Sequence, residues 1–99
     1  MEASYTFVGE LRAPRHGDFW VMVALPADDA EDIKALVPHR PGFGSVRVSA
    51  AIGGSVWSTS IYPDNAVGSY LLPVKKSVRD HEGVEVGDVA TITVTVMFD

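Results

Sequence analysis

Hydrophobic and polar residues alternate along three stretches of the chain, and this pattern predicts half-buried β-strands. The first stretch runs from Tyr5 to Arg12, and the last from Ala90 to Phe98, where apolar residues alternate with threonines. The middle stretch, Val46 to Tyr62, is divided by Gly53-Gly54. Two glycines between β-rich runs predict a β-hairpin with a two-residue turn of type I′ or II′.

The hairpin turn determines which residues face each other, because side chains alternate between the two faces of a strand. One face is predicted to be buried, since small Ala50 leaves room there for the indole of Trp57. The pairs on this face are Ala50 with Trp57, Val48 with Thr59, and Val46 with Ile61. The pairs on the opposite, polar face are Arg47 with Ser60 and Ser49 with Ser58.

Phe19 to Leu25 is apolar on both faces, which predicts a central strand or one covered on both sides. After Pro26 the pattern predicts a helix of about ten residues, with Asp28 as its N-cap and Glu31 completing a capping box. Pro38 prevents the helix from continuing, and a loop is expected over residues 41–44. The apolar stripe of the helix consists of Ala30, Ile33, Leu36 and Val37.

Tyr70 to Val74 predicts a short strand with an exposed edge, so both a monomer and a homodimer paired through that edge are open. Lys75 to Glu82 predicts a short helix, which ends at Gly83 in a position that favours a left-handed backbone. Asp88, directly after Gly87, is expected to accept backbone N–H bonds in the turn before the last strand.

Six strands, two short helices and regular turn signals predict a mostly β fold, a small and mostly closed β-barrel. A chain of 99 residues, 46% hydrophobic and 21% charged, is typical of one globular domain, which we assign to residues 1–99. No cysteine is present, which excludes disulfides and a thiol nucleophile. Neither a membrane-spanning apolar run nor a signal peptide is recognised, so the expected location is the cytoplasm.

Several motifs extend over nearly the whole chain: W-V-x-V-x-L-P from Trp20 to Pro26, G-S-V-R-V from Gly44 to Val48, I-G-G before Trp57, then Y-L-L-P-V-K-K-S-V-R and G-D-V. This series resembles a family of bacterial and archaeal β-barrel domains of about this length. The family is classified as a domain of unknown function. Some members are fused to a bacteriocin-protection-type helical segment, which this chain lacks. The resemblance implies the barrel and brings no activity, substrate or catalytic residue with it.

A partial likeness covers Leu72 to Val94, where L-P, V-R, G-V and G-D occur in that order. This order is similar to that of the AbrB-like swapped-hairpin regulators, which are DNA-binding dimers. Pro73 to Arg79 is slightly too long for that pattern, and the rest of the chain has no counterpart in it. The likeness implies half of a barrel and does not imply DNA binding.

A net charge of −5 argues against nucleic acid or an anionic membrane as a partner. Even so, three of the eight basic residues crowd into Lys75, Lys76 and Arg79, at a local electrostatic cost within one helix. One interpretation is that this basic turn and the first backbone N–H groups of the helix cradle an anion. The other is a solvated face, in which Asp80 neutralises Lys76 and Glu82 neutralises Arg79.

The polar face of the hairpin offers hydroxyls and a guanidinium, which suit a phosphate, a carboxylate or a polar metabolite, and the alternative is a plain solvent-facing sheet. Trp20 and Trp57 are expected to pack in the core rather than to stack on a base or sugar. Tyr62 and Tyr70 flank a loop and are freer to contact a ligand. The three histidines lie in separate segments, so no metal site is expected.

We therefore predict a non-catalytic binding module for a small anionic or polar ligand, with no cofactor and no metal. The predicted binding residues are Arg47, Ser60, Lys75 and Arg79. The runner-up is an interaction domain that docks a protein partner or a nucleic acid through the basic turn Lys75 to Arg79. An enzyme is the least favoured class, since the sequence contains no recognisable catalytic motif.

Overall fold

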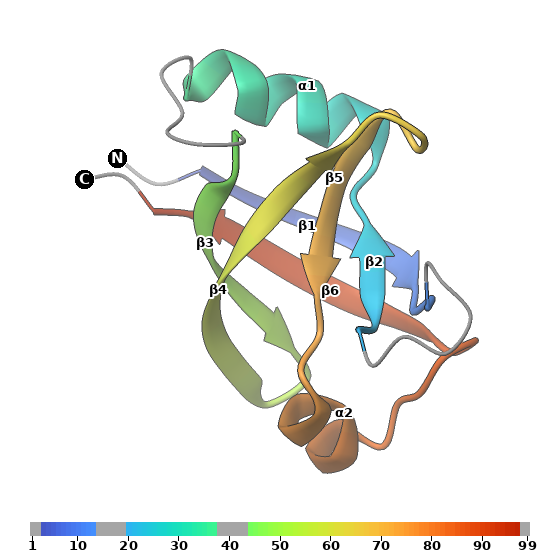
Figure 1. Cartoon of the computed structure of the whole chain (residues 1–99). Coiled ribbons are helices and arrows are strands. Elements are labelled where there is room, and N and C mark those ends of the chain that lie inside the picture. Colours follow the sequence, from blue (N-terminus) through green and yellow to red (C-terminus); the bar gives the residue numbers. More distant parts are fainter. Residues whose placement is uncertain (1–2, 14–19, 38–43, 98–99) are drawn as a thin grey trace.

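A computed structural model of the chain describes residues 3–13, 20–37 and 44–97. Figure 1 shows the order of its strands and helices along the chain. The elements are β1 (Ala3–Glu10), β2 (Met22–Ala24), α1 (Ala27–Leu36), β3 (Val46–Ile52), β4 (Ser55–Asp64), β5 (Ser69–Pro73), α2 (Lys76–Glu82) and β6 (Val89–Val96).

These strands form one antiparallel sheet in the order β1-β6-β3-β4-β5-β2. The chain just beyond β1 also meets β2, because Arg12 and Met22 exchange both backbone hydrogen bonds at 2.8 Å. The sheet therefore curls into a nearly closed barrel, which confirms the predicted fold class. Helix α1 lies across one end of the barrel and α2 lies at the other end (Figure 1).

The hairpin of β3 and β4 has the predicted register, with every predicted pair in place. Gly53 has a φ of 56° and Gly54 has no positive φ, which is the pattern of a type II′ turn. Ala50 is fully buried and Trp57 is only 6% exposed, as the buried face requires. A shift of one residue would turn Arg47 and Ser60 into the barrel, and this cost keeps the register unique.

The core fills the barrel and both of its ends. β4 belongs to both halves of the sheet, since its first part pairs with β3 and its last part with β5. Ile33 of α1 and Val78 of α2 are buried at the two ends. The largest side chains with almost no exposed surface are Tyr70, Leu11, Ile33, Ile61, Leu72 and Ile92.

The first and last strands along the chain, β1 and β6, also alternate as predicted. Phe7 and Leu11 are buried from the first stretch, and Ile92, Val94 and Val96 from the last. On the outer face, hydroxyls pair across the two strands: Ser4 with Thr95 at 2.8 Å and Thr6 with Thr93 at 2.9 Å. Phe98, predicted to face the core, lies outside the described residues.

The prediction of a central strand over residues 19–25 was wrong. Among the described residues of this stretch, 20–25, only Met22–Ala24 is a strand, and it stands last in the strand order. Val21, Val23 and Leu25 face the core, whereas Trp20 is 62% exposed and Ala24 is exposed. The outward residues are apolar because they line surface depressions, and not because a second layer covers the strand.

The prediction of an exposed edge at residues 70–74 was also wrong. β5 pairs with β4 along one side and with β2 along the other. The N–H of Leu25 also donates to the carbonyl of Tyr70 at 3.0 Å. Tyr70 is fully buried, so it is not available to a ligand, whereas Tyr62 is 45% exposed.

Helix α1 has the predicted length of 10 residues but not the predicted cap. The residue before it, Pro26, has an extended conformation, and its carbonyl accepts the N–H of Ala30 at 3.0 Å. Asp28 therefore lies inside the first turn with Asp29, where both carboxylates still complement the helix dipole. Glu31 forms no capping box, and it lies 3.9 Å from Lys34 instead.

The turns around α2 were predicted correctly. Gly83 ends the helix with a left-handed φ of 67°, and its N–H donates to the carbonyl of Arg79. Asp88 Oδ2 accepts the backbone N–H of Glu85 at 2.9 Å, which is the structural role expected of it. Neither α1 nor α2, the helices of the described residues, is long and apolar enough to cross a membrane.

Helix α1 is tied to β1 by a titratable contact, which gives a first prediction. The hydroxyl of Tyr5 donates to Asp32 Oδ2 at 2.5 Å. Partial burial, this hydrogen bond and the charges of Asp32 and Asp29 raise the pKa of Tyr5 from 10.0 to about 12. Because the folded state holds this proton more tightly, the stabilisation is complete below pH 10 and is lost as the pH rises through 12.

We therefore expect the difference in unfolding free energy between the wild type and Tyr5→Phe to shrink as the pH rises from 10 to 12. Urea denaturation at several pH values measures it. Other titrating groups change both proteins equally, so they cancel in the difference. A difference that stays constant would show that the proton of Tyr5 contributes nothing.

Candidate functional site

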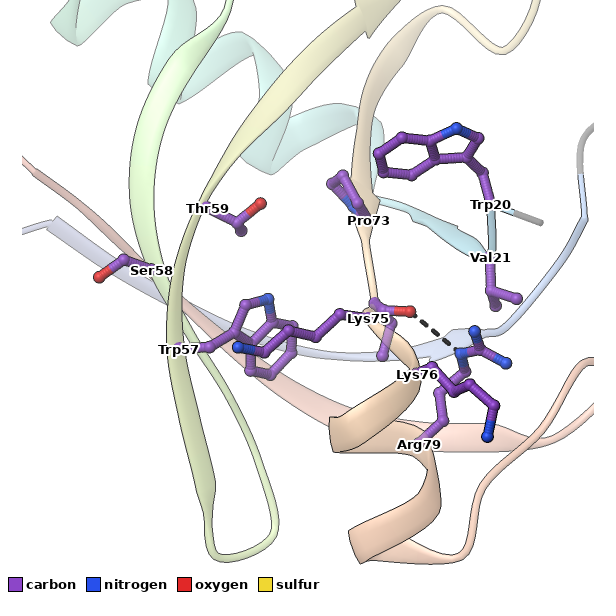
Figure 2. A pocket seen from close by; sticks show the side chains of 10 residues that line it. Trp20, Val21, Trp57, Ser58, Thr59, Pro73, Lys75, Lys76 and Arg79 are labelled. Atoms are coloured by element: carbon purple, nitrogen blue, oxygen red, sulfur yellow. Dashed lines mark hydrogen bonds between the residues drawn. The ribbon is translucent and has the colours of Figure 1, made fainter.

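A pocket of about 490 Å³ lies where β2, β4, β5 and α2 meet, and we call it the tryptophan pocket (Figure 2). Its lining combines an apolar floor, two indoles, two hydroxyls and three cationic side chains. No carboxylate of the described residues lines it. The lining residues are Trp20, Val21, Trp57, Ser58, Thr59, Pro73, Val74, Lys75, Lys76 and Arg79.

The barrel holds the apolar part of this pocket in place. Trp57 enters from β4, where it faces small Ala50 across the hairpin. The N–H of Val74 donates to the carbonyl of Val21 at 2.9 Å, which joins the end of β5 to the start of β2. In Figure 2 Pro73 lies between the two indoles, with Trp20 on one side and Trp57 on the other.

Arg79 is the most constrained of the three cations. Its side chain is half-buried, and Nε donates to the carbonyl of Val74 at 3.1 Å (Figure 2). The ion pair with Glu82, which belonged to the solvated-face interpretation, does not form, because no described carboxylate lies within 4.0 Å of Arg79. The guanidinium is therefore oriented by a backbone carbonyl, and its two terminal amino groups form no hydrogen bond to the described residues.

The two lysines differ in their partners. Lys76 Nζ lies 2.7 Å from Asp80 Oδ2, as the sequence predicted for this pair one turn apart. Lys75 has no ion pair with the described residues. In Figure 2 its side chain extends across the pocket toward Trp57. Lys75 and Arg79 thus supply the positive charge that no neighbouring carboxylate within the described chain offsets.

Glu82 holds the two walls of the pocket together. Its side chain is only 16% exposed, and its carboxylate accepts a hydrogen bond from the hydroxyl of Ser55 at 2.5 Å. This contact joins α2 to the start of β4. Arg79 lies one turn before Glu82, and Trp57 lies two residues after Ser55. One hydrogen bond therefore positions the basic wall relative to the indole wall.

The structure brings together half of the predicted binding residues. Lys75 and Arg79 line the tryptophan pocket, whereas Arg47 and Ser60 do not. Arg47 donates to Ser60 Oγ at 3.4 Å on the outer face of the hairpin. The residue that connects that face with the pocket is Ser58, which the pairing with Ser49 had placed on the polar face.

Sequence reasoning missed Trp20 as a residue of this pocket. Trp20 stood in an apolar run, and an apolar run predicts burial whether its outer face meets a second layer or a hollow. Trp57 was correctly predicted to pack in the barrel, and its edge also reaches the pocket.

A second depression of about 660 Å³ lies along the seam between β1 and β2. Its charged lining residues already have partners, because Arg12 lies 3.4 Å from Glu10. The third charged residue, Asp64, accepts the backbone N–H groups of Ala66 and Val67 in the β4–β5 turn. Although this depression is larger, it offers a ligand less unpaired charge than the tryptophan pocket does.

The described residues contain no group of three or more His, Asp or Glu side chains close enough to hold a metal ion. His81 is the histidine within the described residues, and it lies 3.9 Å from Glu82. His16 and His39 are outside them.

Fold and pocket together define a class of protein, a small and nearly closed β-barrel with two short helices and a basic, tryptophan-lined pocket. The family model described as "Domain of unknown function (DUF1905)" matches residues 7–94. Since this match covers most of the chain, the chain belongs to that family, as the motifs in its sequence had indicated. No curated protein matches the chain significantly.

Proposed function

We propose that this domain is a non-catalytic binding module for small organic anions, and that the tryptophan pocket is its binding site. One observation carries the proposal. Three cationic side chains and no described carboxylate line the pocket, although the chain as a whole has a net charge of −5. Such a local reversal of charge favours the entry of an anion.

Arg79 is assigned the main contact with the anion. A guanidinium presents its donors in a planar fork that matches a carboxylate or a phosphate, and holding the fork in place reduces the entropy lost on binding. The hydrogen bond from Nε to the carbonyl of Val74 provides that restraint. The terminal amino groups remain for the ligand.

Lys75 is assigned the second contact. Because it has no ion pair with a described residue, it can turn toward an anion without breaking one. Lys76 contributes less, since its contact with Asp80 at 2.7 Å partly neutralises it. The apolar floor of Val21, Pro73 and Val74 suits the body of an organic molecule better than a bare inorganic ion.

The test is isothermal titration calorimetry at low ionic strength with benzoate, inorganic phosphate and AMP. We expect saturable one-to-one binding of at least one organic anion. Arg79→Ala should weaken that binding about tenfold or more, because a hydrogen bond to a charged group contributes about 1.5–3 kcal/mol. Amide NMR spectra of both proteins report whether the fold is retained.

Arg47→Ala is the matched control, since it removes the same charge from the outer face of the hairpin. It should leave the affinity nearly unchanged. If Arg47→Ala weakens binding as much as Arg79→Ala does, the polar face of the hairpin takes part and the pocket is not the whole site. If a DNA duplex binds instead, with an affinity that falls steeply with salt, the domain docks nucleic acid through its basic turn.

A further inference from the structure

The two tryptophans of the pocket carry information beyond its charge. Only 6% of Trp57 is exposed, yet its indole N–H has no hydrogen-bond partner among the described residues. Buried polar groups are nearly always paired, and leaving a donor unpaired costs stability. An acceptor atom of a ligand would pair this buried donor, and the new hydrogen bond would favour binding.

The indole of Trp57 has a defined place in the pocket. Figure 2 shows it extending from β4 toward β5 and α2, with its nitrogen on the side where Thr59 and Pro73 lie. Lys75 extends toward the same indole. Since Lys75 is exposed and has no ion pair with a described residue, it can change its position at little cost.

Trp20 presents the opposite situation, a large aromatic ring that is 62% exposed. Single exposed apolar residues are common, but this indole lies at the rim of the pocket and beside Pro73. An indole face is a good surface for stacking a planar ring. The pocket thus offers a donor at one wall, a stacking surface at the other and an apolar floor between them.

We propose that the ligand is an aromatic anion, a planar ring joined to a carboxylate or a phosphate. Its ring stacks on Trp20 across Pro73. One oxygen of its anionic group accepts the indole N–H of Trp57, and Arg79 and Lys75 neutralise the charge. This inference rests on the proposed function and adds the chemical class of the ligand to it.

Two pairs of probes separate the ring from the charge. Benzoate and cyclohexanecarboxylate have the same carboxylate on rings of similar size, and only benzoate is aromatic. AMP and ribose 5-phosphate have the same phosphate, and only AMP has a base. We expect the aromatic member of at least one pair to bind about fivefold more tightly. The pair that shows the preference identifies a carboxylate or a phosphate ligand.

Trp20→Ala is expected to abolish this preference, because the affinity should fall more for the aromatic member of the pair than for the non-aromatic one. The indole N–H signals in ¹H–¹⁵N NMR spectra provide an independent readout, and Trp20→Phe assigns them. The Trp57 indole N–H should shift and exchange more slowly with solvent when the preferred aromatic anion is added, because it gains an acceptor.

The outcomes distinguish this inference from the proposed function. If no anion binds, both are overturned. If the anions bind and lose affinity in Arg79→Ala, but each pair shows equal affinities in the wild type and in Trp20→Ala, the proposed function stands and the aromatic ligand is wrong. A Trp57 indole signal that stays unchanged at saturation would also overturn the aromatic ligand, since no acceptor would have reached the nitrogen.

Discussion

Gly53→Ala is expected to lower the free energy of unfolding by about 2–3 kcal/mol, because two costs add at this position. Gly53 has a φ of 56°, a left-handed conformation that strains any residue with a Cβ. A Cβ built there would also collide with Glu82 Oε1. Glu82 then has to move, and its hydrogen bond with Ser55 is lost. Urea denaturation measures the change.

Gly54→Ala is the matched control for this prediction. It changes the neighbouring residue of the same turn, where φ is not positive and a Cβ meets nothing within 4 Å. Its effect should stay below about 1 kcal/mol in either direction. In a Glu82→Ala background the collision is absent, so Gly53→Ala should cost only the backbone strain. An equal cost in both backgrounds would show that Glu82 does not hold the turn.

The hairpin was predictable in full because its information is local. Gly53-Gly54 specifies the turn, and a two-residue turn leaves one register for the strands. The alternation on both strands agrees with that register, so turn and pattern point to the same pairing. The same agreement between propensity and pattern explains why β1 and β6 were predicted correctly.

The places of β2 and β5 in the sheet were harder to predict from the sequence, because they depend on how the barrel closes. Residues 19–25 and 70–74 read as a central and an edge strand, respectively, yet the sheet order puts β2 last and β5 inside. An apolar run reports that both faces avoid water, and it does not report what covers them. Closure pairs Arg12 with Met22, and the apolar pattern of neither stretch specifies this partner.

Half of the site was predictable for a related reason. Lys75 directly precedes α2 and Arg79 lies one turn further along, so their local charge is visible in the sequence itself. The hydrogen bond from Arg79 to the carbonyl of Val74 is local too, but the sequence suggested Glu82 as its partner. Trp20 reaches the pocket only through the pairing of β2 with β5. Residues that meet through strand pairing far along the chain cannot be grouped from spacing alone.

Trp57→Ala is expected to destabilise the protein by about 3 kcal/mol, since truncation of a buried aromatic residue leaves a cavity. Trp57 is 6% exposed and packs inside the barrel opposite Ala50. The loss lies at the low end of the usual range for such truncations, because the same change removes a buried N–H without a described partner. Urea denaturation followed by far-UV circular dichroism measures it without relying on tryptophan fluorescence.

Trp20→Ala is the matched variant, and comparing its stability with that of Trp57→Ala shows which indole supports the core. With 62% of Trp20 exposed, its truncation should change stability by no more than about 0.5 kcal/mol. If both variants lost the same free energy of unfolding, Trp20 would be a core residue, as the sequence alone had predicted. The pocket would then have no stacking surface. A large loss at Trp57 and a small one at Trp20 separates two roles within one pocket. The first indole supports the barrel and offers one donor, while the second is held at the rim with its face free for a ligand.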